Sequence, residues 1–164
     1  MTNFPWLSVI TFAPMIGVLF ILLIRGNPEV VARNTRAVAL WTSLITFAVS
    51  MGIWVKFDNA IVGFQFEEKA VWMESLGLAY HLGVDGISMF FILLSTLLTV
   101  LCIAASWISI TDRVKEYMIS FLVLETLMIG MFSALDLVLF YVFFEGVLIP
   151  MFLIIGVWGG PRRN

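Results

Sequence analysis

Residues 137–158 read LVLFYVFFEGVLIPMFLIIGVW, an apolar run whose only charged side chain is Glu145. About 20 predominantly apolar residues suffice for a helix to cross the hydrocarbon core of a bilayer, so the run is long enough to span it. A carboxyl group near the centre of such a span costs at least about 2.5–3.5 kcal/mol, and residues of this kind usually mark ion or proton paths. We therefore interpret the run as a transmembrane helix that carries a functional acid.

The composition places the whole chain in the membrane. It is 62% hydrophobic and 12% charged, whereas soluble domains carry about 25% charged residues. The net charge of −2 leaves no basic surface for nucleic acid. Cys102 is the single cysteine and stands in an apolar run, where we expect it to be buried. One thiol excludes a disulfide framework and a cysteine-held metal or iron–sulfur site.

The pattern predicts an all-α polytopic membrane protein with five transmembrane helices in one membrane domain over residues 1–164. The spans cover about 6–24, 37–55, 87–109, 117–134 and 137–158. The first run is not a signal peptide, because no Lys or Arg precedes it and Arg25 follows it. The long connection 56–84 predicts a small β-hairpin, with strand-like residues at 64–66 and 71–73, a turn at 75–77 and a return strand at 79–82.

Lys and Arg are distributed unequally between the predicted connections. Those after the first, third and fifth spans share one side of the membrane, and those after the second and fourth share the other. The first group holds Arg25, Arg33, Arg36, Arg113, Lys115, Arg162 and Arg163, and the second group holds Lys56 and Lys69. Positive charge gathers on the cytoplasmic side, which predicts that the N-terminus and the hairpin face outside.

The neighbours of Glu145 support a functional role. Pro150 has no N–H, so the carbonyl of Gly146 loses its helical donor and a kink is expected beside the carboxyl group. Tyr141 lies one turn earlier and is placed to hydrogen-bond the acid. The alternatives are an incidental acid at a packing face and a proline kink that serves packing alone.

Glu125 is a second, weaker candidate for a proton relay. It lies ten residues before a tight connection near Leu135, and Glu145 lies ten residues after it. In an antiparallel helical pair, both carboxyl groups reach the same depth, about 15 Å from the turn. No Lys or Arg falls inside the predicted spans, so either both acids stay protonated or a cation comes from elsewhere.

The other polar residues suit structural roles. Asp85, Asp112 and Asp136 precede predicted spans and suit helix N-caps, while Asp136 is also a candidate for the outer mouth of a proton path. His81 has no metal-ligand partner at a useful spacing and is interpreted as a surface residue. The sequence shows no nucleophile triad, P-loop or dinucleotide motif, so we expect no metal and no redox cofactor of its own.

Two stretches resemble the M-subunit family of proton-pumping NADH:quinone oxidoreductase, complex I, the family of mitochondrial subunit 4. They are residues 140–163, FYVFFEGVLIPMFLIIGVWGGPRR, and residues 82–88, LGVDGIS. The similarity extends over essentially the whole chain. It implies the N-terminal part of an antiporter-like helical bundle, because members of the family have many more helices.

The resemblance also implies a function. In the family, the glutamate matching Glu145 pairs with a lysine on a later helix, and an acid matching Glu125 is typical. The chain would translocate protons as a non-redox membrane-arm subunit in a bacterial or mitochondrial inner membrane, beside L-like and N-like subunits. NADH, flavin, iron–sulfur clusters and quinone would belong to other subunits. The alternatives are a subunit of a multi-subunit cation/proton antiporter and a truncated, non-transporting membrane scaffold.

Overall fold

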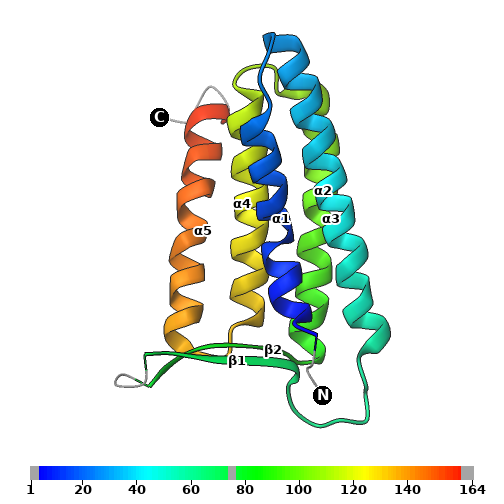
Figure 1. The fold of residues 1–164 in the computed structure, drawn as a ribbon, viewed down its shortest axis with the longest axis vertical. Helices are drawn as coiled ribbons and strands as arrows, with labels where there is room; N and C mark the ends of the chain where they lie inside the picture. Colours follow the sequence, from blue (N-terminus) through cyan, green and yellow to red (C-terminus); the bar gives the residue numbers. More distant parts are fainter. Residues whose placement is uncertain (1–3, 74–76, 160–164) are drawn as a thin grey trace.

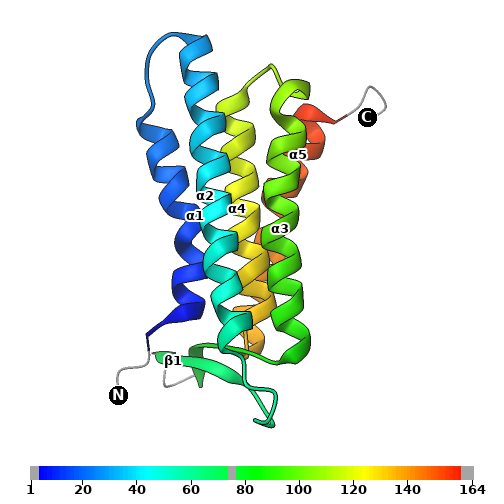
Figure 2. The ribbon, with the colours of Figure 1, turned by 90° about the vertical axis from the view of Figure 1, so that its right-hand side faces the viewer.

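The computed structural model describes residues 4–73 and 77–159. Five long helices run side by side along the longest axis of the molecule (Figures 1 and 2). All five are long and apolar enough to cross a membrane, as predicted for a multi-pass membrane protein. Their bounds are Trp6–Leu23 for α1, Pro28–Lys56 for α2, Gly86–Ser109 for α3, Val114–Ser133 for α4 and Leu137–Trp158 for α5.

Helix α2 starts well before the predicted residue 37. Asn27 is its N-cap residue and Pro28 occupies the first turn, where a proline is tolerated because its missing N–H would have no helical partner. Arg33 and Arg36 therefore lie on the helix and not in a connection, which corrects the sequence prediction. At 29 residues the helix is about 43 Å long, so its polar first turns extend beyond a hydrocarbon core of about 30 Å.

Helix α4 lies at the centre of the bundle and α5 at its edge. Helix α4 packs against each of the other four helices, whereas the main helical neighbour of α5 is α4. Figure 2 shows α4 between α2 and α3 with α5 behind them. The buried side chains of α5 form one narrow stripe of Leu139, Phe143 and Pro150. Most of the surface of α5 is therefore exposed.

The buried apolar residues form two separate clusters. The first lies toward the hairpin end and contains Leu7, Ile10, Ile53, Leu82, Val84, Met89, Ile92, Ile129, Leu139 and Phe143. The second lies toward the opposite end and contains Val18, Ile21, Ala39, Ile103, Val114, Tyr117, Met118 and Leu122. Between the two clusters, at the middle of the bundle, α4 carries the buried carboxyl group of Glu125.

The predicted β-hairpin is present and lies across the end of the bundle where α1 begins (Figure 1). Strands β1, Gln65–Met73, and β2, Leu78–Val84, pair antiparallel. Gly77 has the positive φ of 65° that suits a turn, and positions 75 and 76 of the predicted turn lie outside the described residues. The backbone N–H of Leu135 donates to the carbonyl of His81 at 2.8 Å. The hairpin is thus attached to the α4–α5 connection.

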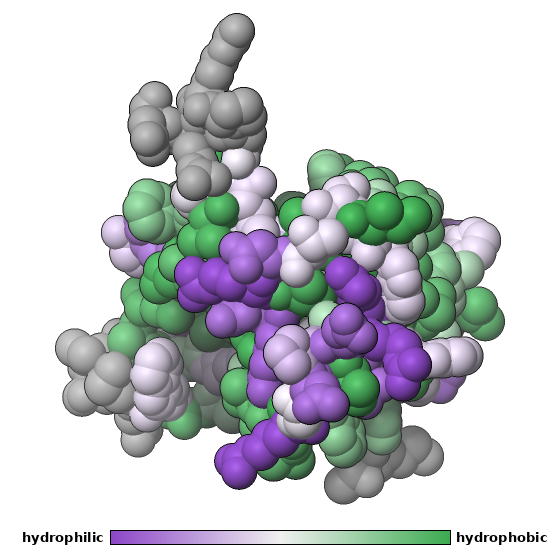
Figure 3. Space-filling model, turned by 90° about the horizontal axis from the view of Figure 1, so that it is seen from above, coloured by the Kyte–Doolittle hydropathy of each residue, from purple (hydrophilic) through white to green (hydrophobic). Residues whose placement is uncertain are grey.

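The opposite end of the bundle is polar. Viewed along the axis, hydrophilic residues gather at its middle and hydrophobic residues surround them (Figure 3). The α1–α2 and α3–α4 connections meet at this end, with Arg25, Arg33, Arg113 and Lys115. Lys56 and Lys69 belong to the hairpin end, as predicted, while Arg162 and Arg163 lie outside the described residues. Which end faces the cytoplasm stays a prediction.

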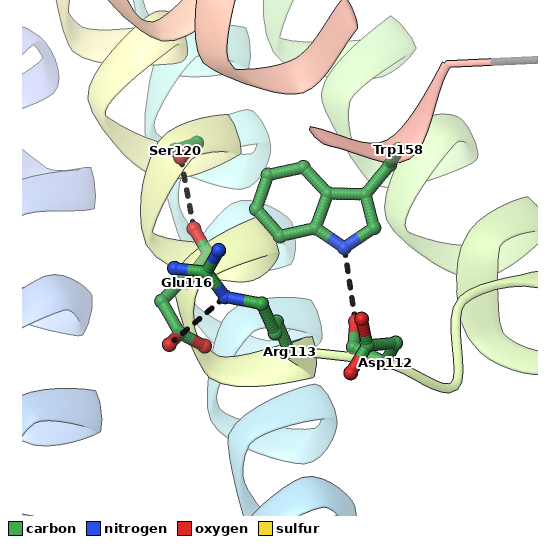
Figure 4. A network of polar contacts seen from close by, with 5 residues as sticks. All are labelled: Asp112, Arg113, Glu116, Ser120 and Trp158. Atoms are coloured by element: carbon green, nitrogen blue, oxygen red, sulfur yellow. Dashed lines mark hydrogen bonds and ion pairs between the residues drawn. The ribbon is translucent and has the colours of Figure 1, made fainter. Parts of the chain in front are cut away.

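The α3–α4 connection corrects the capping role predicted for Asp112. Helix α4 begins at Val114, and its N-cap residue is Arg113, which has left-handed backbone angles and makes no side-chain cap bond. The carbonyl of Asp112 instead accepts a hydrogen bond of 2.9 Å from the indole N–H of Trp158 at the end of α5 (Figure 4). Nearby, the Arg113 guanidinium lies 3.5 Å from the Glu116 carboxylate.

Candidate functional site

Glu145 lies at the middle of α5 and is exposed. The buried stripe of Leu139, Phe143 and Pro150 faces the rest of the bundle. With 3.6 residues per turn, Glu145 lies about 140° around the helix from the middle of that stripe. Its carboxyl group is therefore directed away from α4, on a face that no other described helix covers.

Tyr141 accompanies Glu145 on this outer face. Its hydroxyl group interacts with the Glu145 carboxylate, as the spacing of one turn predicts, and both residues are exposed. Pro150 is buried and lies inside α5, which continues through it as a single helix. The proline still deprives the Gly146 carbonyl of its donor. A carboxyl group, a phenol and a backbone carbonyl without its helical donor thus lie within two turns at mid-span.

Glu125 has the opposite environment. It is 0% exposed, and neither carboxyl oxygen has a hydrogen-bond partner among the described residues. A Cβ added to Gly146 would meet the Leu127 side chain at 3.0 Å, and one added to Gly130 would meet Phe143 at 2.5 Å. These two contacts between α4 and α5 place the two acids within about one turn, or 5 Å, of the same depth.

The packing therefore agrees with the prediction that the carboxyl groups of Glu125 and Glu145 lie at a similar depth, but the two groups do not meet. Glu125 is enclosed by the bundle, and Glu145 is directed outward from its edge helix. No hydrogen bond joins the two carboxyl groups within the described ranges. A direct transfer of a proton between them has no support in this arrangement.

Two of the aspartates are caps, as predicted. Asp85 accepts hydrogen bonds from the backbone N–H groups of Ile87 and Ser88 and forms a capping box with the Ser88 hydroxyl. Asp136 accepts from the backbone of Val138 and Leu139. These hydrogen bonds favour the ionised carboxylate, so the pKa of each aspartate is lowered, chiefly by the Ser88 N–H for Asp85 and the Leu139 N–H for Asp136.

Asp136 does more than cap its own helix. Its carboxylate also accepts a hydrogen bond of 3.3 Å from the backbone N–H of Ala79 on β2, which holds the hairpin to the start of α5. A role for Asp136 at the mouth of a proton path stays a prediction. The side chain of His81 is partly exposed on the hairpin, and its Nε2 lies 3.0 Å from the Glu67 carboxylate.

Sequence reasoning missed Glu68. This residue of β1 accepts hydrogen bonds from the backbone N–H groups of Leu7 and Ser8 and from the Ser8 hydroxyl. Pro5, the N-cap residue of α1, has no polar side chain, so the cap is supplied from another element. The missing cap at Pro5 was the available signal, but the identity of the distant partner depends on tertiary structure.

Two further predictions concern the single thiol and the residues that could hold a metal ion. Cys102 is exposed on α3, which corrects the expectation of a buried thiol, because the apolar run that surrounds it in the sequence presents this position to the exterior of the bundle. Across residues 4–73 and 77–159, no group of three or more His, Cys, Asp or Glu is placed to hold a metal ion.

Comparison with solved structures defines the class. The fold matches a chain of respiratory complex I from Thermus thermophilus with a TM-score of 0.76 and 24% identity, over 96% of this chain and 30% of that chain. It also matches a chain of the membrane-bound sulfane sulfur reductase, an archaeal respiratory membrane complex, with a TM-score of 0.68 and 18% identity, over 92% and 23%. The chain is a multi-pass membrane protein with a helical fold found in respiratory membrane complexes. No family model matches it.

Sequence comparison identifies the relatives. The chain is 53% identical over 158 residues to NADH-quinone oxidoreductase subunit M of Rhodobacter capsulatus and 49% identical over 158 residues to NADH-ubiquinone oxidoreductase chain 4 of Chondrus crispus. These alignments cover 96% of this chain and 30% and 32% of the relatives. The chain is a homologue of subunit M and chain 4 of this oxidoreductase and spans about a third of their length.

Proposed function

We propose that the chain is a non-redox membrane-arm subunit of NADH:quinone oxidoreductase and translocates protons across the membrane, coupled to electron transfer from NADH to quinone. The names of its relatives support the assignment to this oxidoreductase. The position of Glu145 supports the role in proton movement.

The exposed carboxyl group of Glu145 at mid-span is the observation that carries the proposal. Hydrocarbon offers no hydrogen bond to a polar group, and an acid at this depth is costly without a partner. The face of α5 that carries Glu145 and Tyr141 is not covered by any helix that the structure describes. We infer that protein outside the described bundle covers this face and supplies a cation, which accords with the later-helix lysine that the resemblance implies.

The proposal extends to partners, cofactors and orientation. We expect L-like and N-like subunits beside this chain, and we assign NADH, flavin, iron–sulfur clusters and quinone to other subunits of the complex. The excess of Lys and Arg at the end of the bundle opposite the hairpin supports a cytoplasmic location for that end. The N-terminus and the hairpin then face outside.

Replacement of the carboxyl group tests the function. Glu145→Gln preserves shape and hydrogen bonding but cannot titrate, so it should reduce the NADH-driven pH gradient in membrane vesicles to near background while the complex still assembles. Glu116→Gln, at an exposed site near the start of α4, is the matched control and should leave the gradient unchanged. A normal gradient in an assembled Glu145→Gln complex would refute the proposal.

A further inference from the structure

A cavity of about 360 Å³ lies at the hairpin end of the bundle and is lined by Phe4, Trp6, Phe66, Glu67 and Glu68. Three aromatic residues and two acids thus surround one space. Its volume falls in the range of ligand pockets, about 300–1,000 Å³. Aromatic rings and carboxylates together recognise an ammonium group, because both attract its positive charge.

The aromatic residues at this end already hold one ammonium group of the chain. The Lys56 Nζ lies 4.1 Å from the centroid of the Trp6 ring. The ring centroids of Phe4 and Trp6 are 4.9 Å apart, with an edge-to-face arrangement. Because Trp6 also lines the cavity, the positive charge of Lys56 lies beside it.

Glu67 is the acid that can accept further hydrogen bonds. Its side chain is 51% exposed, and its partner within the described part of the chain is the His81 Nε2. A carboxylate offers about four lone-pair sites, so one imidazole leaves most of them unused. The Glu68 carboxylate differs, because it accepts from the backbone N–H groups of Leu7 and Ser8. Glu68 therefore contributes mainly its negative charge.

Lys56 supplies the opposite charge beside the cavity. It lies in the last turn of α2 and is exposed. Across residues 4–73 and 77–159, no carboxylate lies within ion-pair distance of its ammonium group. A lysine of this kind binds phosphate as a point charge. Negative and positive charges thus lie side by side, in the pattern that complements a zwitterionic headgroup.

The cavity also lies at the depth of lipid headgroups. Helix α1 has 18 residues and is about 27 Å long, close to the hydrocarbon thickness of about 30 Å. Its first residue, Trp6, therefore lies near the boundary between hydrocarbon and headgroups, where tryptophan is enriched in membrane proteins. A lipid of the surrounding leaflet would present its headgroup at the cavity.

An apolar stripe for acyl chains begins within one turn of Trp6. It contains Val9, Phe12 and Ile16, which recur on one face of α1 and are exposed. Leu19 and Leu23 extend the same face toward the opposite end of the bundle. The stripe therefore runs from the level of the cavity into the hydrocarbon, as the chains of a bound lipid do.

We propose that this cavity binds a zwitterionic phospholipid with a primary ammonium headgroup, as in phosphatidylethanolamine. The ammonium group donates to the Glu67 carboxylate among the aromatic rings, and Lys56 binds the phosphate. The acyl chains lie along the stripe on α1. A choline headgroup has no N–H to donate to Glu67, and a glycerol headgroup has no positive charge. The site does not depend on the proposed role in proton translocation.

Photo-crosslinking to the full-length protein in its assembled complex tests the site. The complex is reconstituted into liposomes that contain phosphatidylethanolamine with a diazirine near the top of one acyl chain, and labelled peptides are identified by mass spectrometry. We expect labelling around Val9 and Phe12. Phosphatidylcholine and phosphatidylglycerol with the same diazirine should label this region about two- to fivefold less, the size expected for one cation contact at an exposed site.

Single variants at exposed positions remove one contact each. Glu67→Gln and Phe4→Leu should each lower labelling by phosphatidylethanolamine about two- to fivefold. Lys56→Gln should lower labelling by all three lipids, because all three carry the phosphate. Glu29→Gln, in the first turn of α2 at the opposite end of the bundle, is the matched control for Glu67→Gln and should leave labelling unchanged.

Four outcomes would overturn the lipid site. They are no labelling at the start of α1, equal labelling by the three lipids, unchanged labelling in Glu67→Gln, and an equal loss in Glu29→Gln, which would indicate a general effect of surface charge. The measurement does not use proton pumping. Its result is therefore separate from the outcome of Glu145→Gln.

Discussion

The Glu68 carboxylate on strand β1 accepts a hydrogen bond of 2.7 Å from the backbone N–H of Leu7 in the first turn of α1. An acid at a helix N-terminus satisfies N–H groups that have no helical partner and complements the positive end of the helix dipole. The backbone next to it is unusual. Phe66 has a positive φ of 56°, and the strand register shifts between Gln65 and Glu68. This bulge directs the Glu68 side chain toward α1.

Replacement of Glu68 by Ala should loosen the start of α1. Loss of an N-cap costs about 0.5–2 kcal/mol, and we expect an effect of this size. Faster hydrogen exchange at Leu7 and Ser8 would report it. Glu67→Ala, which removes the partner of His81 and not a cap, is the control and should leave exchange in α1 unchanged. Equal protection in both variants would contradict the capping role.

The Asp85 cap should make stability depend on pH. Its folded-state pKa is lowered, chiefly by the Ser88 N–H. The stabilisation is therefore fully present above the pKa of the unfolded chain and is lost as the pH falls through the folded-state value. Wild type should exceed Asp85→Asn in thermal unfolding temperature at neutral pH, and the gap should narrow in acid. A gap that stays constant down to acid pH would refute this linkage.

Close packing of α4 on α5 should not tolerate a methyl group at Gly130. An added Cβ would lie 2.5 Å from the Phe143 ring, and overpacking of this kind costs about 1–3 kcal/mol. We expect Gly130→Ala to lower the thermal stability of the complex in detergent. Gly52→Ala is the matched control, because its Cβ would meet Trp6 at an ordinary 3.4 Å. Similar stabilities for the two variants would show that the ring moves aside freely.

Orientation can be read from cysteine labelling with a membrane-impermeant maleimide. Val62, before β1, is 102% exposed and lies at the hairpin end, whereas Asn27 is exposed at the opposite end. In a background with Cys102 replaced, Val62→Cys should react from outside intact cells, and Asn27→Cys only after permeabilisation. The reverse pattern would invert the proposed topology.

The sequence predicted the spans well because length and hydropathy are local properties. Helix α5 begins and ends at the predicted residues, and α1, α3 and α4 differ by a few residues. The predicted start of helix α2 was wrong, because the first turns of this helix are polar and hydropathy did not detect them. The dipeptide Asn27-Pro28 was the stronger signal there, since it combines an N-cap residue with a first-turn proline.

The candidate site was only partly predictable. Helical spacing identified Tyr141 as the neighbour of Glu145, and symmetry about the turn gave the depth of Glu125. Spacing within one helix does not show which side of that helix faces its neighbours. The enclosure of Glu125 and the exposure of Glu145 could therefore be seen only in the packed structure.

The hairpin imposes an order on assembly. Its strands end at Val84, but its hydrogen bonds reach back to Leu7 and Ser8 and forward to Leu135 and Asp136. A ribosome that has just released the hairpin has not yet made the α4–α5 connection, so the hairpin cannot complete its contacts until the fourth span has entered the bilayer. Closing such distant contacts late is entropically costly. We therefore expect the hairpin to complete its contacts only after the first four helices have been synthesised.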